Sequence, residues 1–352
     1  MPDEELTETD YHQIALELDA LRQEITESLG ARDAAYIRRL IAVQRGLELT
    51  GRLLLFGSRR RALWLTGTAA LSLAKILENM EIGHNVMHGQ WDWMHDPKIH
   101  STTWEWDSVS PADQWKHLHN VVHHTNTNIL GKDADLGFGL IRIRPEQEWT
   151  PFALGQPIYA LLLQMFFEYG VAIDDLEMNK ILAGEHDKAA TKAKLAGIRA
   201  KIRRQWAKDY LAFPALTGRN FVPTLLANAT ANIVRNVWAS TIIFCGHFPD
   251  GVEAFPEECL ENETRGQWYV RQLTGSADIQ GGPLFHILTG NLSHQIEHHL
   301  FPDLPSNRHP QIAARVRELC EKYRLPYNTG PLHRQYGTTW RTIVRLAFPG
   351  RR

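Results

Sequence analysis

The chain has 352 residues, 43% of them hydrophobic, which is enough for one large domain or two ordinary ones. Its formal net charge of −2 gives no support to a broadly basic surface, so nucleic-acid binding is not expected. The three cysteines, Cys245, Cys259 and Cys320, are far apart, which argues against zinc ribbons, iron–sulfur clusters and a disulfide framework.

The N-terminal region reads as water-exposed and helical. Residues 1–10 are acidic and polar and lack the basic and apolar segments of a secretory signal. Residues 9–47 place apolar side chains such as Leu18, Leu21 and Ile25 among charges, which predicts an amphipathic helix. We therefore expect residues 1–44 to form a soluble helical segment.

Apolar stretches interrupted by polar residues follow, at residues 47–56, 62–76, 152–173 and 221–248. A membrane helix needs ~20 mainly apolar residues, and the mean hydropathy of the whole chain is negative. Hydropathy therefore leaves two alternatives open, namely membrane helices or the buried helices of a soluble bundle. In both cases polar residues such as Asn228 and Arg235 are expected to face a protein interior.

The segments between and after these stretches are more polar. Residues 174–208 are rich in lysine and arginine, which predicts a helix in water or along a membrane surface. Residues 249–280 contain prolines and glycines that predict a loop. Residues 311–324 have the spacing of an amphipathic helix.

Three histidine clusters stand out, at residues 84–88 (HNVMH), 119–124 (HNVVHH) and 294–299 (HQIEHH). Each contains two histidines four positions apart, which share one face of a regular helix. A single such pair is more often structural, but imidazole is also the commonest protein ligand for transition metals. Because a tetrahedral ion is saturated by four ligands, three clusters predict one centre with more than one metal ion.

The surrounding motifs exclude several classes of metal enzyme. The zinc-protease pattern HExxH and the deaminase pattern PCxxC are absent from the sequence. A soluble di-iron carboxylate bundle needs two ExxH motifs, and only Glu81 with His84 supplies one in these clusters. A set of eight or nine histidines with few carboxylates suits iron, copper or zinc.

At these clusters the chain resembles the membrane fatty acid desaturase family, which has three histidine boxes. The resemblance runs from roughly residue 45 to 330 and is closest to bacterial acyl-CoA or acyl-lipid desaturases. The segments that carry it are residues 83–89 (GHNVMHG), 295–302 (QIEHHLFP), 304–310 (LPSNRHP) and 320–326 (CEKYRLP).

The resemblance implies an all-α fold, a helical integral membrane protein with four spans and a cytosolic helical cap that holds a di-iron centre. Residues 45–330 would form the desaturase domain and residues 331–352 a C-terminal tail. The implied location is the bacterial inner membrane, with the active site facing the cytoplasm. Arg59, Arg60 and Arg61 would then lie outside, against the positive-inside tendency, so some stretches are expected to be interfacial instead of spanning.

The implied activity is that of an oxidoreductase. With two iron ions, O2 and two electrons, the family converts adjacent methylenes of a fatty acyl chain into a cis double bond. The carrier of the acyl chain, CoA or lipid, stays open. Because the sequence has neither a haem-binding HPGG nor a GxGxxG motif, electrons are expected from a separate ferredoxin, rubredoxin or cytochrome donor with an NAD(P)H reductase. A fatty acyl or alkane hydroxylase on the same scaffold and a non-catalytic metal-binding membrane protein are the alternatives.

The resemblance also assigns the ligands, and no catalytic residues beyond them are expected. The assigned ligands are His84, His88, His119, His123, His124, His298 and His299. His247 matches a further ligand at the end of the last membrane helix. Family members often carry a histidine at the position of Gln295. We nevertheless favour His294 as a contributor, because imidazole binds iron better than a neutral amide. Gln295, Glu297 and Asn291 are expected to support the ligands.

Overall fold

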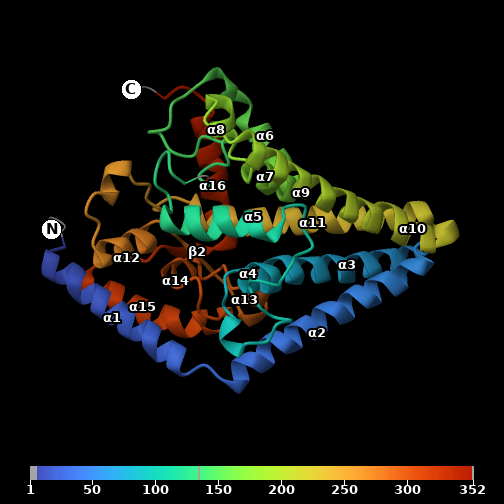
Figure 1. Ribbon diagram of the computed structural model, residues 1–352, viewed down its shortest axis with the longest axis horizontal. Helices are drawn as coiled ribbons and strands as arrows, with labels where there is room; N and C mark the ends of the chain where they lie inside the picture. Colours follow the sequence, from blue (N-terminus) through green and yellow to red (C-terminus); the bar gives the residue numbers. More distant parts are fainter. Residues whose placement is uncertain (1–5, 134, 351–352) are drawn as a thin grey trace.

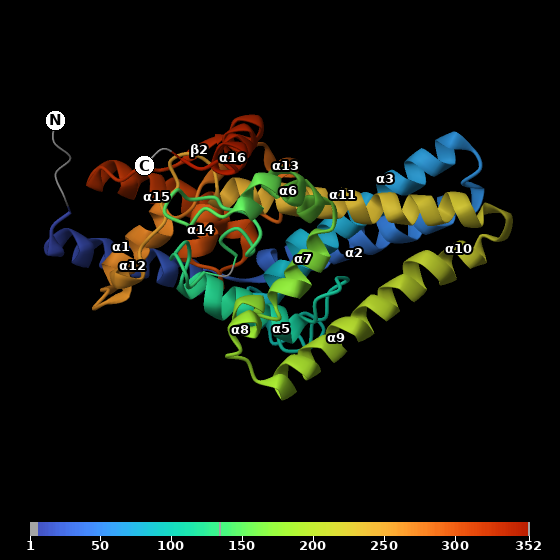
Figure 2. The ribbon, with the colours of Figure 1, turned by 90° about the horizontal axis from the view of Figure 1, so that it is seen from above.

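The computed structural model describes residues 6–133 and 135–350, and helices dominate it (Figures 1 and 2). The α-helices are α1 Glu8–Glu27, α2 Ala31–Leu54, α3 Arg61–Leu77, α4 Asn85–Met87, α5 Ala112–Lys116, α6 Gln156–Met165, α7 Phe167–Asp174, α8 Met178–Ala183, α9 Lys188–Trp206, α10 Phe213–Leu216, α11 Phe221–His247, α12 Arg265–Thr274, α13 Pro283–Leu288, α14 Gln295–Leu300, α15 His309–Tyr323 and α16 Leu332–Leu346. Three π-helical segments are η2 Glu78–His84, η4 His117–His123 and η6 Ala207–Ala212, and the strands are β1 Asp278–Gln280 and β2 Thr329–Pro331.

The N-terminal segment contains two helices instead of the single predicted helix. Thr7 caps α1 in a capping box with Asp10, and α1 packs its apolar face against α12 and α15. The helix is interrupted before Gly30, which caps the start of α2. The N–H of Gly30 donates to the carboxylate of Asp33 over 3.0 Å. The prediction of helix over residues 9–47 is therefore confirmed, but the prediction of one continuous helix is wrong. The cap at Gly30 starts a new helix and so interrupts the first.

The predicted apolar stretches at 47–56, 62–76 and 221–248 form the long helices that lead to the histidines. α2 and α3 make a hairpin, and α11 runs beside α3. Gly51 permits the close packing of this hairpin, because a Cβ there would lie 3.0 Å from the carbonyl oxygen of Gly67. The remaining apolar stretch, residues 152–173, is split into α6 and α7 at Phe166. Figure 2 shows that α9 and α11 meet at α10 and diverge from there.

Polar residues of these helices face one another, as the sequence predicts for Asn228 and Arg235. Arg52 donates to Asn228 over 2.8 Å and to Asp209 over 3.0 Å. Lys75 reaches the other oxygen of Asp209 over 2.8 Å, and the guanidinium of Arg235 is buried. The charges are thus paired inside the protein, which lowers the cost of removing them from water.

Within the two described ranges, no helix combines the length and apolar composition that crossing a bilayer requires. The helical fold class is confirmed. The four spans stay a prediction.

One detail of the prediction is wrong. Residues 249–280 are more than a loop, because Thr264 and Gln267 form a capping box that starts α12, and α12 buries Tyr269 and Leu273. The helical fold also contains a small sheet, in which β1 and β2 pair in parallel with Asp278 opposite Thr329. This small sheet holds the C-terminal segment next to the third histidine cluster.

Candidate metal centre

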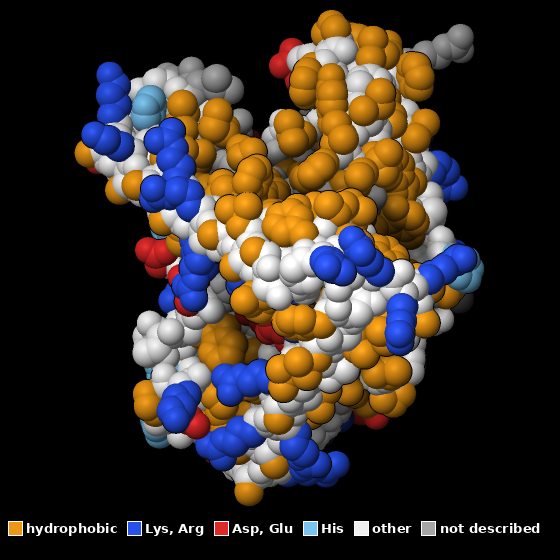
Figure 3. All heavy atoms as spheres, turned by 90° about the vertical axis from the view of Figure 1, so that its right-hand side faces the viewer, with side chains coloured by type: hydrophobic (Ala, Val, Ile, Leu, Met, Phe, Trp, Pro, Cys, Tyr) orange, Lys and Arg blue, Asp and Glu red, His pale blue; other side chains and the backbone are white. Residues whose placement is uncertain are grey.

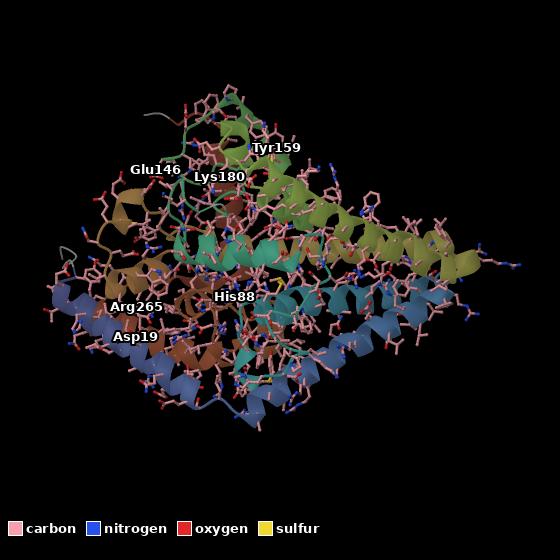
Figure 4. All side chains as sticks on the ribbon, in the orientation of Figure 1. Asp19, His88, Glu146, Tyr159, Lys180 and Arg265 are labelled. Carbon is pink, nitrogen blue, oxygen red and sulfur yellow. The ribbon has the colours of Figure 1, made fainter. Side chains whose placement is uncertain are left out.

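The three histidine clusters converge in the interior, where His88 lies near the middle of the molecule between helices from both halves of the chain (Figure 4). His84 ends the π-helical segment η2, and His119 and His123 lie on η4. Wider π-helical turns often occur at functional sites because they change the direction in which side chains project. His298 and His299 of the third cluster lie on α14, and His247 is the last residue of α11.

The first histidine group contains His84, His88, His119 and His298, whose available ring nitrogens lie within 4.8 Å of one another. His84 Nε2 and His119 Nε2 are 3.3 Å apart. The ring centres of His88 and His298 are separated by 4.7 Å. All three sequence clusters therefore supply this group.

The second histidine group contains His123, His247 and His299, again with nitrogens within 4.8 Å of one another. His247 Nε2 and His299 Nε2 are 3.3 Å apart. The group adjoins the first, since the rings of His119 and His123 stack with centres 5.1 Å apart. The position of His247 at the end of α11 matches the prediction made for it.

His124 lies between the two groups. Its ring stacks on His299 at 4.4 Å and meets His88 edge-on at 4.7 Å. Both of its ring nitrogens are buried and have no hydrogen-bond partner. Its ring thus contacts a member of each group.

Several histidines form a hydrogen bond to a neighbouring side chain through Nδ1. His123 Nδ1 bonds the carboxylate of Asp133 at 2.9 Å, and His119 Nδ1 bonds that of Asp135 at 3.2 Å. His299 Nδ1 lies 3.1 Å from Thr127 Oγ1. Such bonds fix the ring orientation and leave Nε2 available for a metal ion. Asp133 and Asp135 were missed in the sequence, although carboxylates soon after a ligand cluster are a recognisable signal.

The histidines fit a metal centre by an observation independent of any family. Nε2 of His88, His123 and His298 is buried without a hydrogen-bond partner, a costly arrangement unless another group binds there. Burial lowers the pKa of His84 to about 4 and, together with neighbouring histidines, lowers the pKa of His298 well below its usual value. The imidazoles of His84 and His298 therefore favour the neutral form, which can donate a lone pair to a metal ion.

The pKa of His123 is shifted in the opposite direction. Burial alone would lower its pKa, but Asp133 and Asp135 outweigh this effect and raise the pKa to about 9. The two carboxylates thus bring negative charge close to the second histidine group. That charge would offset part of the positive charge of a bound cation.

The placement of His294 corrects the helical-spacing argument. α14 begins only at Gln295, and His294 precedes it with a non-helical backbone (φ −105°, ψ 58°). The ring of His294 therefore does not share a face with His298 and instead lies with Asp278 and Glu297, outside both histidine groups. The sequence argument failed because it extended the helix one residue too far.

Gln295 lies beside the second histidine group, with Nε2 3.0 Å from His247 Nε2. Gly246 permits this approach, because a Cβ there would lie 2.8 Å from Gln295 Cγ. Asn291 and Glu297 form hydrogen bonds with other side chains. Asn291 donates to Glu81 over 3.0 Å, and Glu297 accepts from Tyr327 over 3.0 Å.

A cavity adjoins both histidine groups. His84, His119, His123 and His247 form one part of its wall. Aromatic and aliphatic side chains form much of the remainder, among them Met80, Trp106, Trp115, Phe138, Phe167, Val171, Ile243 and Leu292. An apolar group in this cavity would therefore lie against the imidazoles.

The comparisons with known proteins agree with this geometry. The family described as "Fatty acid desaturase" matches residues 62–331. The "NADPH-dependent stearoyl-CoA 9-desaturase" of Mycobacterium tuberculosis (strain ATCC 25618 / H37Rv) is 53% identical over 348 residues, which cover 98% of this chain and 82% of that protein. The "sn-1 linoleoyl-lipid 6-desaturase" of Synechocystis sp. is 25% identical over 276 residues, or 76% of each chain. The chain therefore belongs to the fatty acid desaturase family.

Proposed function

We propose that this desaturase holds two iron ions at its two histidine groups and uses O2 to introduce a cis double bond into an acyl-CoA. The observation that carries the proposal is the convergence of seven histidines in two adjoining groups. Nε2 of His88, His123 and His298 in these groups is buried and has no hydrogen-bond partner. Such a set can serve two ions, since one tetrahedral ion uses only four ligands.

The chemistry requires a metal because an unactivated C–H bond offers no handle to an acid or a base. When bound, the irons would supply oxygen-dependent removal of two hydrogens. The protein's own residues hold the ligands and orient the substrate. Asp133 and Asp135 hold the rings of His123 and His119, and the apolar side chains around the cavity keep water from the acyl chain.

The substrate part of the proposal rests on similarity to known desaturases. The relative that is 53% identical is named as a stearoyl-CoA 9-desaturase, whereas the relative named for a lipid-bound substrate is 25% identical. Identity therefore favours acyl-CoA as the substrate. The relative's name also supports stearoyl as the acyl chain and position 9 as the site of the double bond.

We also propose that the protein sits on the bacterial inner membrane with its metal centre on the cytoplasmic side. Figure 3 looks onto the end that carries α10, where hydrophobic side chains spread over much of the face among lysines and arginines. Leu216, Val222 and Leu226 of α10 and α11 are 53–67% exposed. Exposed apolar side chains flanked by basic residues suit the interface of an anionic bilayer.

Reconstitution with defined substrates tests the activity. Iron-loaded protein would be incubated with O2, NADPH and either stearoyl-CoA or a stearoyl lipid. Each mixture would be prepared with and without a ferredoxin and its reductase. Gas chromatography and mass spectrometry would identify the product and the double-bond position. We expect a 9-cis monounsaturated product from stearoyl-CoA only with the donor system, and no product from His88→Gln. His333→Gln, at an exposed position, is the control.

Other outcomes would overturn separate parts of the proposal. A hydroxylated product would identify a hydroxylase. Loaded protein that consumes no O2 with either substrate would identify a non-catalytic metal-binding protein. Product from the lipid alone would contradict acyl-CoA, and activity with NADPH and the purified chain alone would contradict the separate electron donor. Flotation with anionic vesicles tests the membrane surface, and Leu226→Glu is expected to weaken binding.

A further inference from the structure

A second kind of side-chain cluster lies outside the two histidine groups. Asp278 of β1, His294 before α14 and Glu297 of α14 bring one nitrogen and two carboxylate oxygens within 4.8 Å of one another. All three side chains are buried, with exposed fractions of 2%, 6% and 0%. The cluster therefore gathers ligand-type atoms away from bulk water.

The polar atoms of this cluster are not satisfied within the protein. Both ring nitrogens of His294 and Oε2 of Glu297 are buried and have no hydrogen-bond partner. A buried polar group without a partner destabilises the fold, because it has lost its bonds to water and gained none in the protein. The hydroxyl of Tyr327 bonds Asp278 and also lies 3.0 Å from Glu297 Oε1, so the two carboxyl groups are held close together. A bound cation would satisfy the free atoms and offset the repulsion.

The separations also suit a cation better than direct hydrogen bonds. His294 Nδ1 lies 3.7 Å from Asp278 Oδ2 and 3.8 Å from Glu297 Oε2. Both distances exceed the hydrogen-bonding range. They are near the ~3.4 Å that separates two ligands each ~2.1 Å from a tetrahedral ion.

We propose that Asp278, His294 and Glu297 form a third metal site, separate from the two histidine groups, which binds a divalent cation of the zinc class. One imidazole and two carboxylates are a donor set that zinc accepts. A water molecule would complete its coordination. Binding of this cation is separate from the proposed desaturase activity and does not depend on the identity of the acyl substrate.

The surroundings provide access and support for such an ion. A hollow of about 330 Å³ borders Asp278 and His294 and gives an entry path. The ligands are also held from behind, since Asp278 Oδ1 accepts the N–H of Ile296 over 3.1 Å. The ring of His286 stacks on His294 with centres 4.5 Å apart. These contacts hold the side chains of Asp278 and His294 at the proposed metal site.

The position of the site indicates a structural role. Glu297 directly precedes His298 and His299 on α14, while Asp278 belongs to β1. An ion bound to both would tie the helix that carries the third histidine cluster to the small sheet. His294 and Glu297 would thus position the metal centre by holding α14.

Metal analysis of the full-length protein tests the site without relying on activity. Protein would be purified from cells supplied with iron and zinc, given zinc at one equivalent and freed of loosely bound ions. Elemental analysis should find about one zinc per chain in addition to iron. His294→Gln and Asp278→Asn should each lose the zinc and keep the iron. His333→Gln, at an exposed position, should keep both metals.

A second measurement uses the unaltered protein, so the proposal stays testable if a variant misfolds. Anomalous diffraction at the zinc edge should place a peak ~2.0–2.2 Å from His294 Nδ1 and a carboxylate oxygen of Asp278 and Glu297. Absence of this peak in zinc-treated crystals would overturn the site. Zinc retained by both variants would also overturn it. Loss of iron instead of zinc from His294→Gln would also overturn the site and would identify His294 as part of the iron centre.

Discussion

Replacing Asp133 by asparagine should weaken iron binding at the second histidine group and also destabilise the loop that carries this residue. In the structure Asp133 uses both oxygens as acceptors. Oδ1 accepts from His123 Nδ1 at 2.9 Å and from the N–H of Asp135 at 3.0 Å, while Oδ2 accepts from the N–H of Asn128 at 2.8 Å. An asparagine has only one acceptor oxygen, so its NH2 must face one of these donors.

The expected magnitude follows from these contacts. Loss of a partner that orients a ligand histidine typically costs 10–100-fold in metal affinity, or ~1.4–2.8 kcal/mol. A buried N–H facing the new NH2 group would add about 1–3 kcal/mol to the loss of folding stability. Since the side chains of His123 and Asp133 are only 2% and 1% exposed, water cannot replace the lost bonds.

The assay separates these two effects. Iron affinity would be measured on folded protein by competition with a chromophoric chelator, and stability by thermal unfolding without metal. Asp113→Asn on α5, at an exposed position, is the control and should match the wild type in both measurements. An Asp133→Asn protein that binds iron within twofold of the wild type would refute the orienting role of this carboxylate.

Three further predictions follow from the geometry. His298→Ala should abolish turnover and lower iron content, whereas the exposed His333→Ala should change neither, as measured by product formation and elemental analysis. Gln295→Ala should lower iron content or activity because its amide lies 3.0 Å from His247 Nε2, and unchanged iron and activity would contradict that role. For Asp33, burial alone would raise the pKa, but hydrogen bonds from Arg308 outweigh it and lower the pKa below its usual value. A depressed folded pKa means that the carboxylate stabilises the fold above its unfolded pKa and loses this effect as pH falls through the folded pKa. Asp33→Asn should therefore cost about 2 kcal/mol at pH 7, with the difference from wild type shrinking below pH ~4, and a pH-independent difference in unfolding free energy would count against this pairing.

The metal-binding character of the protein could be predicted from the sequence because it depends on residue type and short spacing. The histidines of the three clusters, together with His247, carry that information without any knowledge of the tertiary fold. The apolar stretches at 62–76 and 221–248 likewise predicted helices, since hydrophobic composition over many residues is a local property. Polar residues within them were expected inside, and Arg235 is buried.

Only the tertiary structure decided which side chains support the histidines and which ones are redirected. Asp133 reaches His123 because the loop after η4 folds back, and spacing along the chain does not encode that turn. Gln295 faces His247 while His294 faces Asp278, because α14 begins between them. The direction of a side chain at a helix end depends on where the helix starts, and packing and capping set that point after distant segments have met.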